Sequence, residues 1–99
     1  MNMQAMLMQA QKLQRELQKA KAELAAKEFV IEKGGAVKVT VLGNKSVKSI
    51  EIDDNALKED KEMVQDMIVL AINEAHEQIK TAEEEINLQL TGRKEGIGM

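Results

Sequence analysis

The feature that most constrains the fold is an apolar segment at residues 63–72 of this 99-residue chain. Its apolar members are Met63, Val64, Met67, Ile68, Val69, Leu70, Ala71 and Ile72. At about 3.6 residues per turn, these side chains cannot all lie on one face of a helix. Because a helix that is apolar on most sides is buried on most sides, we expect this segment to lie at the centre of the molecule.

Two segments show the spacing of helices that pack along a narrow seam. In the first, apolar residues recur at steps of three and four, at Met3, Met6, Ala10, Leu13, Leu17, Ala20 and Leu24. This heptad pattern predicts a helix over residues 3–27. A second helix is predicted over residues 60–90, capped by Glu59 or Asp60. Its seam consists of Ile68, Ile72, Ala75, Ile79, Ala82 and Ile86.

Residues 28–53 have the pattern of a small sheet. Residues 29–32 are rich in β-forming types, residues 37–41 alternate, and residues 47–52 form a third strand-like run. Gly43 and Asn44 suit a hairpin turn because both tolerate positive φ. Val47 falls on the opposite face from Ile50 and Ile52, which indicates either a bulge or a different strand boundary.

Together these segments predict one α+β domain over residues 1–99. It has a long N-terminal helix, an antiparallel sheet of about three strands and a long C-terminal helix. We expect the helices to pair as an antiparallel coiled-coil arm, with residues 17–24 beside 63–75 and residues 3–13 beside 79–90. The Gly-punctuated tail, residues 91–99, is expected to be disordered. Exposed sheet edges or faces favour a homodimer.

Residues able to carry chemistry are scarce. The chain has no cysteine and one histidine, His76, which flanks the second seam. No set of His, Asp and Glu residues has the spacing of a metal site. We therefore expect no enzyme activity, no metal, no cofactor and no small-molecule substrate. No secretory signal and no membrane-spanning run are evident, which favours the cytoplasm.

Charge is unevenly distributed, although the net charge is only −3. Residues 1–27 carry five basic and two acidic side chains, whereas residues 60–90 carry two basic and eight acidic ones. Lys12, Arg15 and Lys19 form a stripe opposite the first seam. This stripe is either the solvated face of a coiled coil or a surface that contacts phosphates.

The N-terminal tip is rich in methionine, at Met1, Met3, Met6 and Met8. Met-rich surfaces adapt to varied partners. The alternative is that this tip packs against the end of the second helix or against another protomer.

Three motifs carry a family resemblance. They are Val-Lys-Val-Thr-Val at residues 37–41, Ile-Glu-Ile-Asp at residues 50–53 and Asp-Lys-Glu-Met at residues 60–63. With the Met- and Gln-rich first helix, they make the sequence resemble the YbaB/EbfC family of nucleoid-associated proteins over nearly its whole length. Asp54 stands where that family usually has proline.

The resemblance implies a homodimer whose helical arms grip double-stranded DNA in the cytoplasmic nucleoid. It implies a role in gene regulation and no catalysis. Because the family's DNA contacts lie on the arm helices, the residues expected to bind DNA are Lys12, Arg15, Lys19, Lys21, Arg93 and Lys94. The alternative interpretation of the same architecture is a protein-binding clamp of the prefoldin-like, holdase type.

Overall fold

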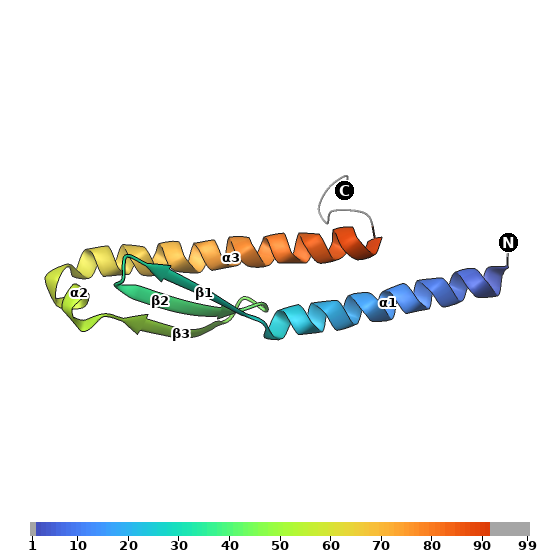
Figure 1. Cartoon of the computed structure of the whole chain (residues 1–99), viewed down its shortest axis with the longest axis horizontal. Coiled ribbons are helices and arrows are strands. Elements are labelled where there is room, and N and C mark those ends of the chain that lie inside the picture. Colours follow the sequence, from blue (N-terminus) through green and yellow to red (C-terminus); the bar gives the residue numbers. More distant parts are fainter. Residues whose placement is uncertain (1, 92–99) are drawn as a thin grey trace.

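The computed structural model describes residues 2–91, with the side chain of residue 91 excepted. The elements in chain order are α1 (Met3–Ala26), β1 (Glu28–Lys33), β2 (Val37–Leu42), β3 (Val47–Ile52), α2 (Asp54–Glu59) and α3 (Lys61–Thr91). The molecule is elongated, with extents of 69 × 25 × 15 Å. The sheet lies at one end of the molecule, beneath the first half of α3 (Figure 1). From the sheet, α1 extends toward the same end of the molecule as the second half of α3.

Side-chain caps fix where the helices begin. Asn2 accepts a hydrogen bond from the backbone N–H of Gln4 at 2.9 Å, and Asp60 accepts one from Met63 at 3.0 Å. Of the two capping residues considered for the second long helix, Asp60 is therefore the one that caps it.

The short helix α2 was not predicted, because residues 53–55 were interpreted only as the end of the sheet. Asp53 caps it by accepting from the N–H of Ala56 at 3.0 Å. Asp54 is its first residue. Proline suits that first position because its N–H is not needed there, and an acidic residue suits it because it faces the positive end of the helix dipole.

The sheet has the order β1-β2-β3 with both neighbouring pairs antiparallel. Thr40 lies opposite Ser49, but Val41 lies opposite Val47, so Lys48 is an extra residue in β3. This β-bulge decides between the two explanations for Val47. It brings Val47 onto the same face as Ile50 and Ile52, which is the face toward α3.

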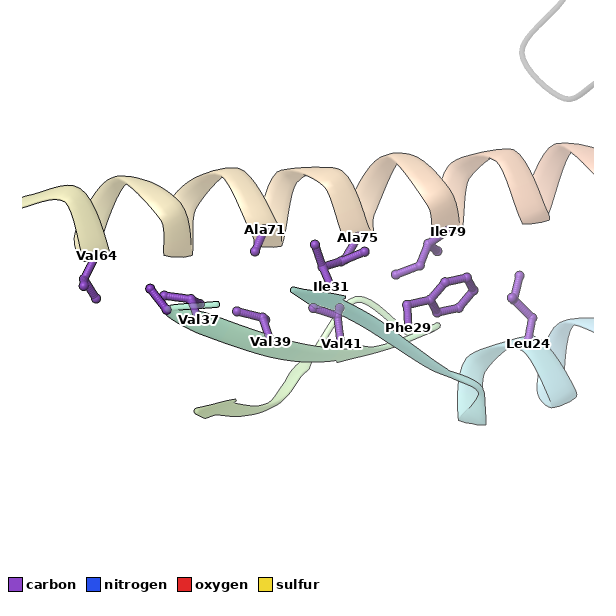
Figure 2. Close-up of a cluster of buried hydrophobic side chains, with 11 residues drawn as sticks. Leu24, Phe29, Ile31, Val37, Val39, Val41, Val64, Ala71, Ala75 and Ile79 are labelled. Carbon is purple, nitrogen blue, oxygen red and sulfur yellow. The ribbon is translucent and has the colours of Figure 1, made fainter. Parts of the chain in front are cut away.

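The core lies between α3 and the neighbouring face of β1 and β2 (Figure 2). Side chains of these two strands point at α3, where Ala71, Ala75 and Ile79 have no exposed surface. The fully or nearly buried apolar residues are Leu24, Phe29, Ile31, Ala36, Val37, Val39, Val41, Val64, Ala71, Ala75 and Ile79.

The expectation that residues 63–72 are buried on most sides is wrong for the single chain. Val64 and Ala71 face the sheet and are buried, but the side chains of Val69 and Leu70 are 57% and 58% exposed. One sheet covers only one side of a helix, so the opposite side has no partner within the protomer.

The expected register of the two long helices is also wrong. The first half of α3 lies on the sheet, so α1 meets only the second half of α3. Lys21 and Leu24 lie beside Glu83 and Ile86. The predicted helices and strands are confirmed, but α1 is displaced along α3 because the strands stand between the start of α3 and the end of α1.

No helix within residues 2–91 is long and apolar enough to cross a membrane.

Ile79→Ala should lower the free energy of unfolding by about 2–5 kcal/mol, because it leaves a cavity at the most enclosed contact between helix and sheet. Urea unfolding followed by circular dichroism at one fixed protein concentration would measure this. Leu88→Ala, on the same helix but half exposed, is the matched control and should change stability by less than about 1 kcal/mol. Equal losses of stability in the two variants would contradict this account of the core.

Candidate nucleic-acid interface

The N-terminal half of α1 projects beyond the end of α3 (Figure 1). The last turn of α3, at Gln89 and Leu90, lies beside Glu16, Lys19 and Ala20 of α1. Residues 3–15 therefore have no other element of the described chain alongside them, and every side chain in this stretch except Leu13 is exposed. This stretch is a free helical rod with solvent around it.

Lys12 and Arg15 on this rod form one stripe with Lys19, which lies one turn further along α1, beside the last turn of α3. Steps of three and four residues keep them within about 60° of each other around the helix axis. All three are exposed. Among residues 2–91, the ion pairs are Lys33 with Glu74 at 2.8 Å and Lys48 with Glu28 at 2.5 Å. The stripe therefore keeps its positive charges available, with Glu16 as the acidic residue that lies among them.

Lys21 does not belong to this stripe. Nine residues separate it from Lys12, which places it on nearly the opposite side of the helix. It lines a cavity of about 480 Å³ between α1 and α3 together with Glu83. The structure therefore brings together three of the four α1 residues expected to bind DNA and separates the fourth.

The remaining residues singled out in the sequence have different positions. Arg93 and Lys94, like the expected disordered tail, lie outside the described residues. His76 is half-buried on the flank of α3, where its Nε2 lies 3.3 Å from the backbone oxygen of Lys45. Lys27 lies over the Phe29 ring at 5.3 Å from its centre, so this cation packs at the base of the arm.

A second exposed surface is apolar and lies at the sheet end. Val47, Ile50 and Ile52 of β3 point to the α3 side, yet each is more than a third exposed because α3 covers mainly β1 and β2. Val69 lies in line with Ile72 and His76 on the flank of α3, and His76 contacts the β2–β3 turn. Val69 therefore faces the same side as β3.

Sequence reasoning missed one contact at the base of α1. It assigned Gly43 only to a turn, whereas Gly43 is buried against the backbone of the last turn of α1. A backbone contact of this kind has no side-chain pattern, so the only signal in the sequence was the glycine itself.

In described residues 2–91, no group of three or more His, Cys, Asp or Glu side chains could hold a metal ion. What the arrangement offers is an exposed helical surface that carries three basic side chains. Such a surface suits the phosphate backbone of a nucleic acid, whose contacts are largely electrostatic and independent of base sequence.

Comparison with known proteins agrees with this geometry. Residues 1–94 match the model of the YbaB/EbfC DNA-binding family. The chain is 47% identical over 76 residues to the nucleoid-associated protein MARTH_orf159 of Metamycoplasma arthritidis (strain 158L3-1), a match that covers 76% of this chain and 79% of that protein. The name of this relative agrees with the nucleoid localisation expected from the sequence. The chain therefore belongs to the YbaB/EbfC family, which is a DNA-binding family and not a known family of enzymes.

Proposed function

We propose that this protein is a nucleoid-associated homodimer that grips double-stranded DNA between two projecting α1 arms. The observation that carries the proposal is the exposed stripe of Lys12, Arg15 and Lys19, whose first two residues lie on the half of α1 that has solvent around it. The contacts are to phosphate, so binding extends to many sequences. An effect on gene expression then follows from occupancy of the chromosome.

The acidic composition is compatible with this proposal because the charges are separated in space. Leu24 lies beside Glu83 and Ile86 of α3. At 1.5 Å per residue, Lys12 lies about 18 Å further along α1. This distance exceeds the screening length of about 10 Å at 0.1 M salt, so the acidic end of α3 has little influence at Lys12, whereas Lys19 lies nearer to it, beside the last turn of α3.

A second copy of the chain accounts for the apolar surface around β3. Three apolar residues of β3 and Val69 of α3 form a surface that one helix is too narrow to cover. A partner's matching surface would bury both at once, as the two-fold symmetry of a homodimer requires. In this arrangement the base of each α1 arm forms a short antiparallel coiled coil with α3. There the α1 seam at Ala20 and Leu24 meets Ile86 and Leu90 of α3.

Reversing the charge of the stripe should abolish most DNA binding. Lys12→Glu with Arg15→Glu is expected to weaken duplex binding by about tenfold or more at low salt. The logarithmic slope of affinity against salt should become shallower by about 0.9 for each phosphate that the variant no longer neutralises. Fluorescence anisotropy with one labelled duplex at several salt concentrations measures both quantities.

The matched control is Lys58→Glu with Lys61→Glu, which makes the same change in net charge at the sheet end of the molecule. Both lysines are exposed, and this variant should keep most of the affinity. Equal weakening by both pairs would show that overall charge, rather than the α1 stripe, determines binding.

Placing a charge on the β3 surface should separate the protomers. Ile50→Glu is expected to yield a folded monomer, since Ile50 is 42% exposed in the single chain and tolerates the change there. Val69→Glu, on α3, should do the same. Sedimentation velocity reports the mass, and circular dichroism reports the fold.

Val30→Glu is the control, because Val30 is similarly exposed, at 46%, on the opposite face of the sheet. It should remain dimeric. A folded, dimeric Ile50→Glu protein would show that the partner lies elsewhere.

The exposed methionines of the α1 tip favour a second candidate function, a clamp for unfolded proteins. Met3 is 83% exposed, and Met6 and Met8 are also exposed. If the tip binds clients, Met3→Ser, Met6→Ser and Met8→Ser together should abolish suppression of the aggregation of a heat-unfolded model protein, measured by light scattering. DNA affinity should survive this change. A wild-type protein that suppresses no aggregation would remove the clamp from consideration.

A further inference from the structure

The direction of α1 is determined where it joins the sheet. Only Lys27 separates the end of α1 from β1, and it already has the extended conformation of a strand, with φ −72° and ψ 141°. The rest of α1 packs mainly against the C-terminal half of α3. A small change of angle at this point would be carried along the whole helix.

The β2–β3 turn holds this point through its backbone. The N–H of Gly43 donates to the carbonyl oxygen of Lys27 at 2.9 Å, and the N–H of Asn44 donates to that of Ala25 at 3.2 Å. The last carbonyls of a helix have no partner within the helix. Here a turn from elsewhere in the chain supplies partners. We call Gly43–Ser46 together with Leu24–Lys27 the arm joint.

Gly43 permits a close approach that no other residue would. A Cβ at this position would overlap the carbonyl oxygen of Leu24 and lie 2.6 Å from its carbonyl carbon and 3.2 Å from the Cα of Ala25. Gly43 is not among the glycines with positive φ. The requirement is therefore for space, and any side chain would displace α1 from the turn.

Hydrogen bonds stabilise the β2–β3 turn itself. The side-chain oxygen of Asn44 accepts hydrogen bonds from the N–H and hydroxyl of Ser46, at 2.9 and 2.6 Å. The backbone oxygen of Lys45 lies 3.3 Å from Nε2 of His76 on α3. The same turn therefore contacts both arm helices, and on each side its own backbone makes the contact.

Packing between the helices alone does not fix their angle. The cavity of about 480 Å³ lies between α1 and α3 directly beside the joint, and Gly43 and Asn44 line it together with Leu24 and Ile86. This open space would let α1 tilt. Because α1 has 24 residues, it is about 36 Å long, and a tilt of about 10° would move its tip by about 6 Å.

We infer that Gly43 is a positioning residue for DNA binding, because its backbone fit against the last turn of α1 sets the angle of the arm. The inference rests on the proposed function for its consequence, the grip on DNA. Its structural part concerns the angle between α1 and α3 and is measured without DNA.

The test is an electron-spin distance measurement on Gly43→Ala. The chain has no cysteine, so spin labels can be placed at Gln9→Cys on α1 and Glu85→Cys on α3, both exposed positions. Excess unlabelled protein of the same variant keeps most labelled chains beside an unlabelled partner. Gly43→Ala should shift or broaden the distance distribution by about 5 Å, as expected for a small tilt of a helix of this length.

In unlabelled protein, Gly43→Ala should weaken duplex binding about tenfold, since an arm that is no longer held must be ordered on binding. Gly35→Asn is the control. A Cβ there meets no atom within 4 Å, and asparagine tolerates the positive φ of 65°. This variant should leave both the distances and the affinity unchanged. If Gly43→Ala fails to fold, Asn44→Ala loosens the same turn from an exposed position and should broaden the distribution.

The outcomes separate the inference from the proposed function. A distance distribution unchanged in both Gly43→Ala and Asn44→Ala would overturn the inference, whatever the DNA affinity. A shifted arm with unchanged affinity would show that the angle has no bearing on binding, and would overturn it as well. A wild-type protein that binds no duplex would overturn the proposed function, and the distances would still decide whether Gly43 sets the arm angle.

Discussion

The rest of the structure depends on the burial of one face of the sheet against the first half of α3. Ala71 and Ala75 let the helix lie close to the strands, and Ile79 closes the far end of the contact. The lengths of the elements then force the shape. A helix of 31 residues is about 46 Å long, whereas strands of six residues span about 20 Å. Residues 80–91, which follow Ile79, therefore extend past the sheet, and the end of α1 packs against this extension.

The same contact explains why the protomer leaves apolar surface exposed. A helix is about 10 Å across, and neighbouring strands are about 4.8 Å apart, so one helix covers about two strands. β1 and β2 are covered, and β3 is not. The apolar residues of β3 and the neighbouring Val69 on α3 therefore remain exposed in the single chain. The sequence predicted that residues 63–72 are buried on most sides, whereas Val69 and Leu70 are exposed in the single chain.

The sequence was sufficient to predict the long helices, the three strands and the hairpin turn, because each has a periodic side-chain pattern of its own. It was insufficient for every feature that depends on how one helix or strand packs against another. The face on which Val47 lies depends on a bulge at Lys48, which only the pairing with β2 reveals. The register of α1 along α3 depends on where α1 is held, and it is held by the backbone of Gly43. The six residues of α2 were missed because they are too few to show a period.

That register also determines the electrostatics of the candidate interface. With the expected register, acidic residues 83–85 would lie near residues 8–12 and offset the charge of Lys12. In the structure Glu83 lines the same cavity as Lys21, so the acidic end of α3 lies at the base of the arm, and the projecting half of α1 carries Lys12 and Arg15. Charge counting along the sequence grouped Lys21 with Lys12, Arg15 and Lys19 and had no means of placing it on another side of α1. The net charge of −3 is therefore a poor guide to DNA binding, because the fold places the acidic and the basic side chains at different distances from the arm joint.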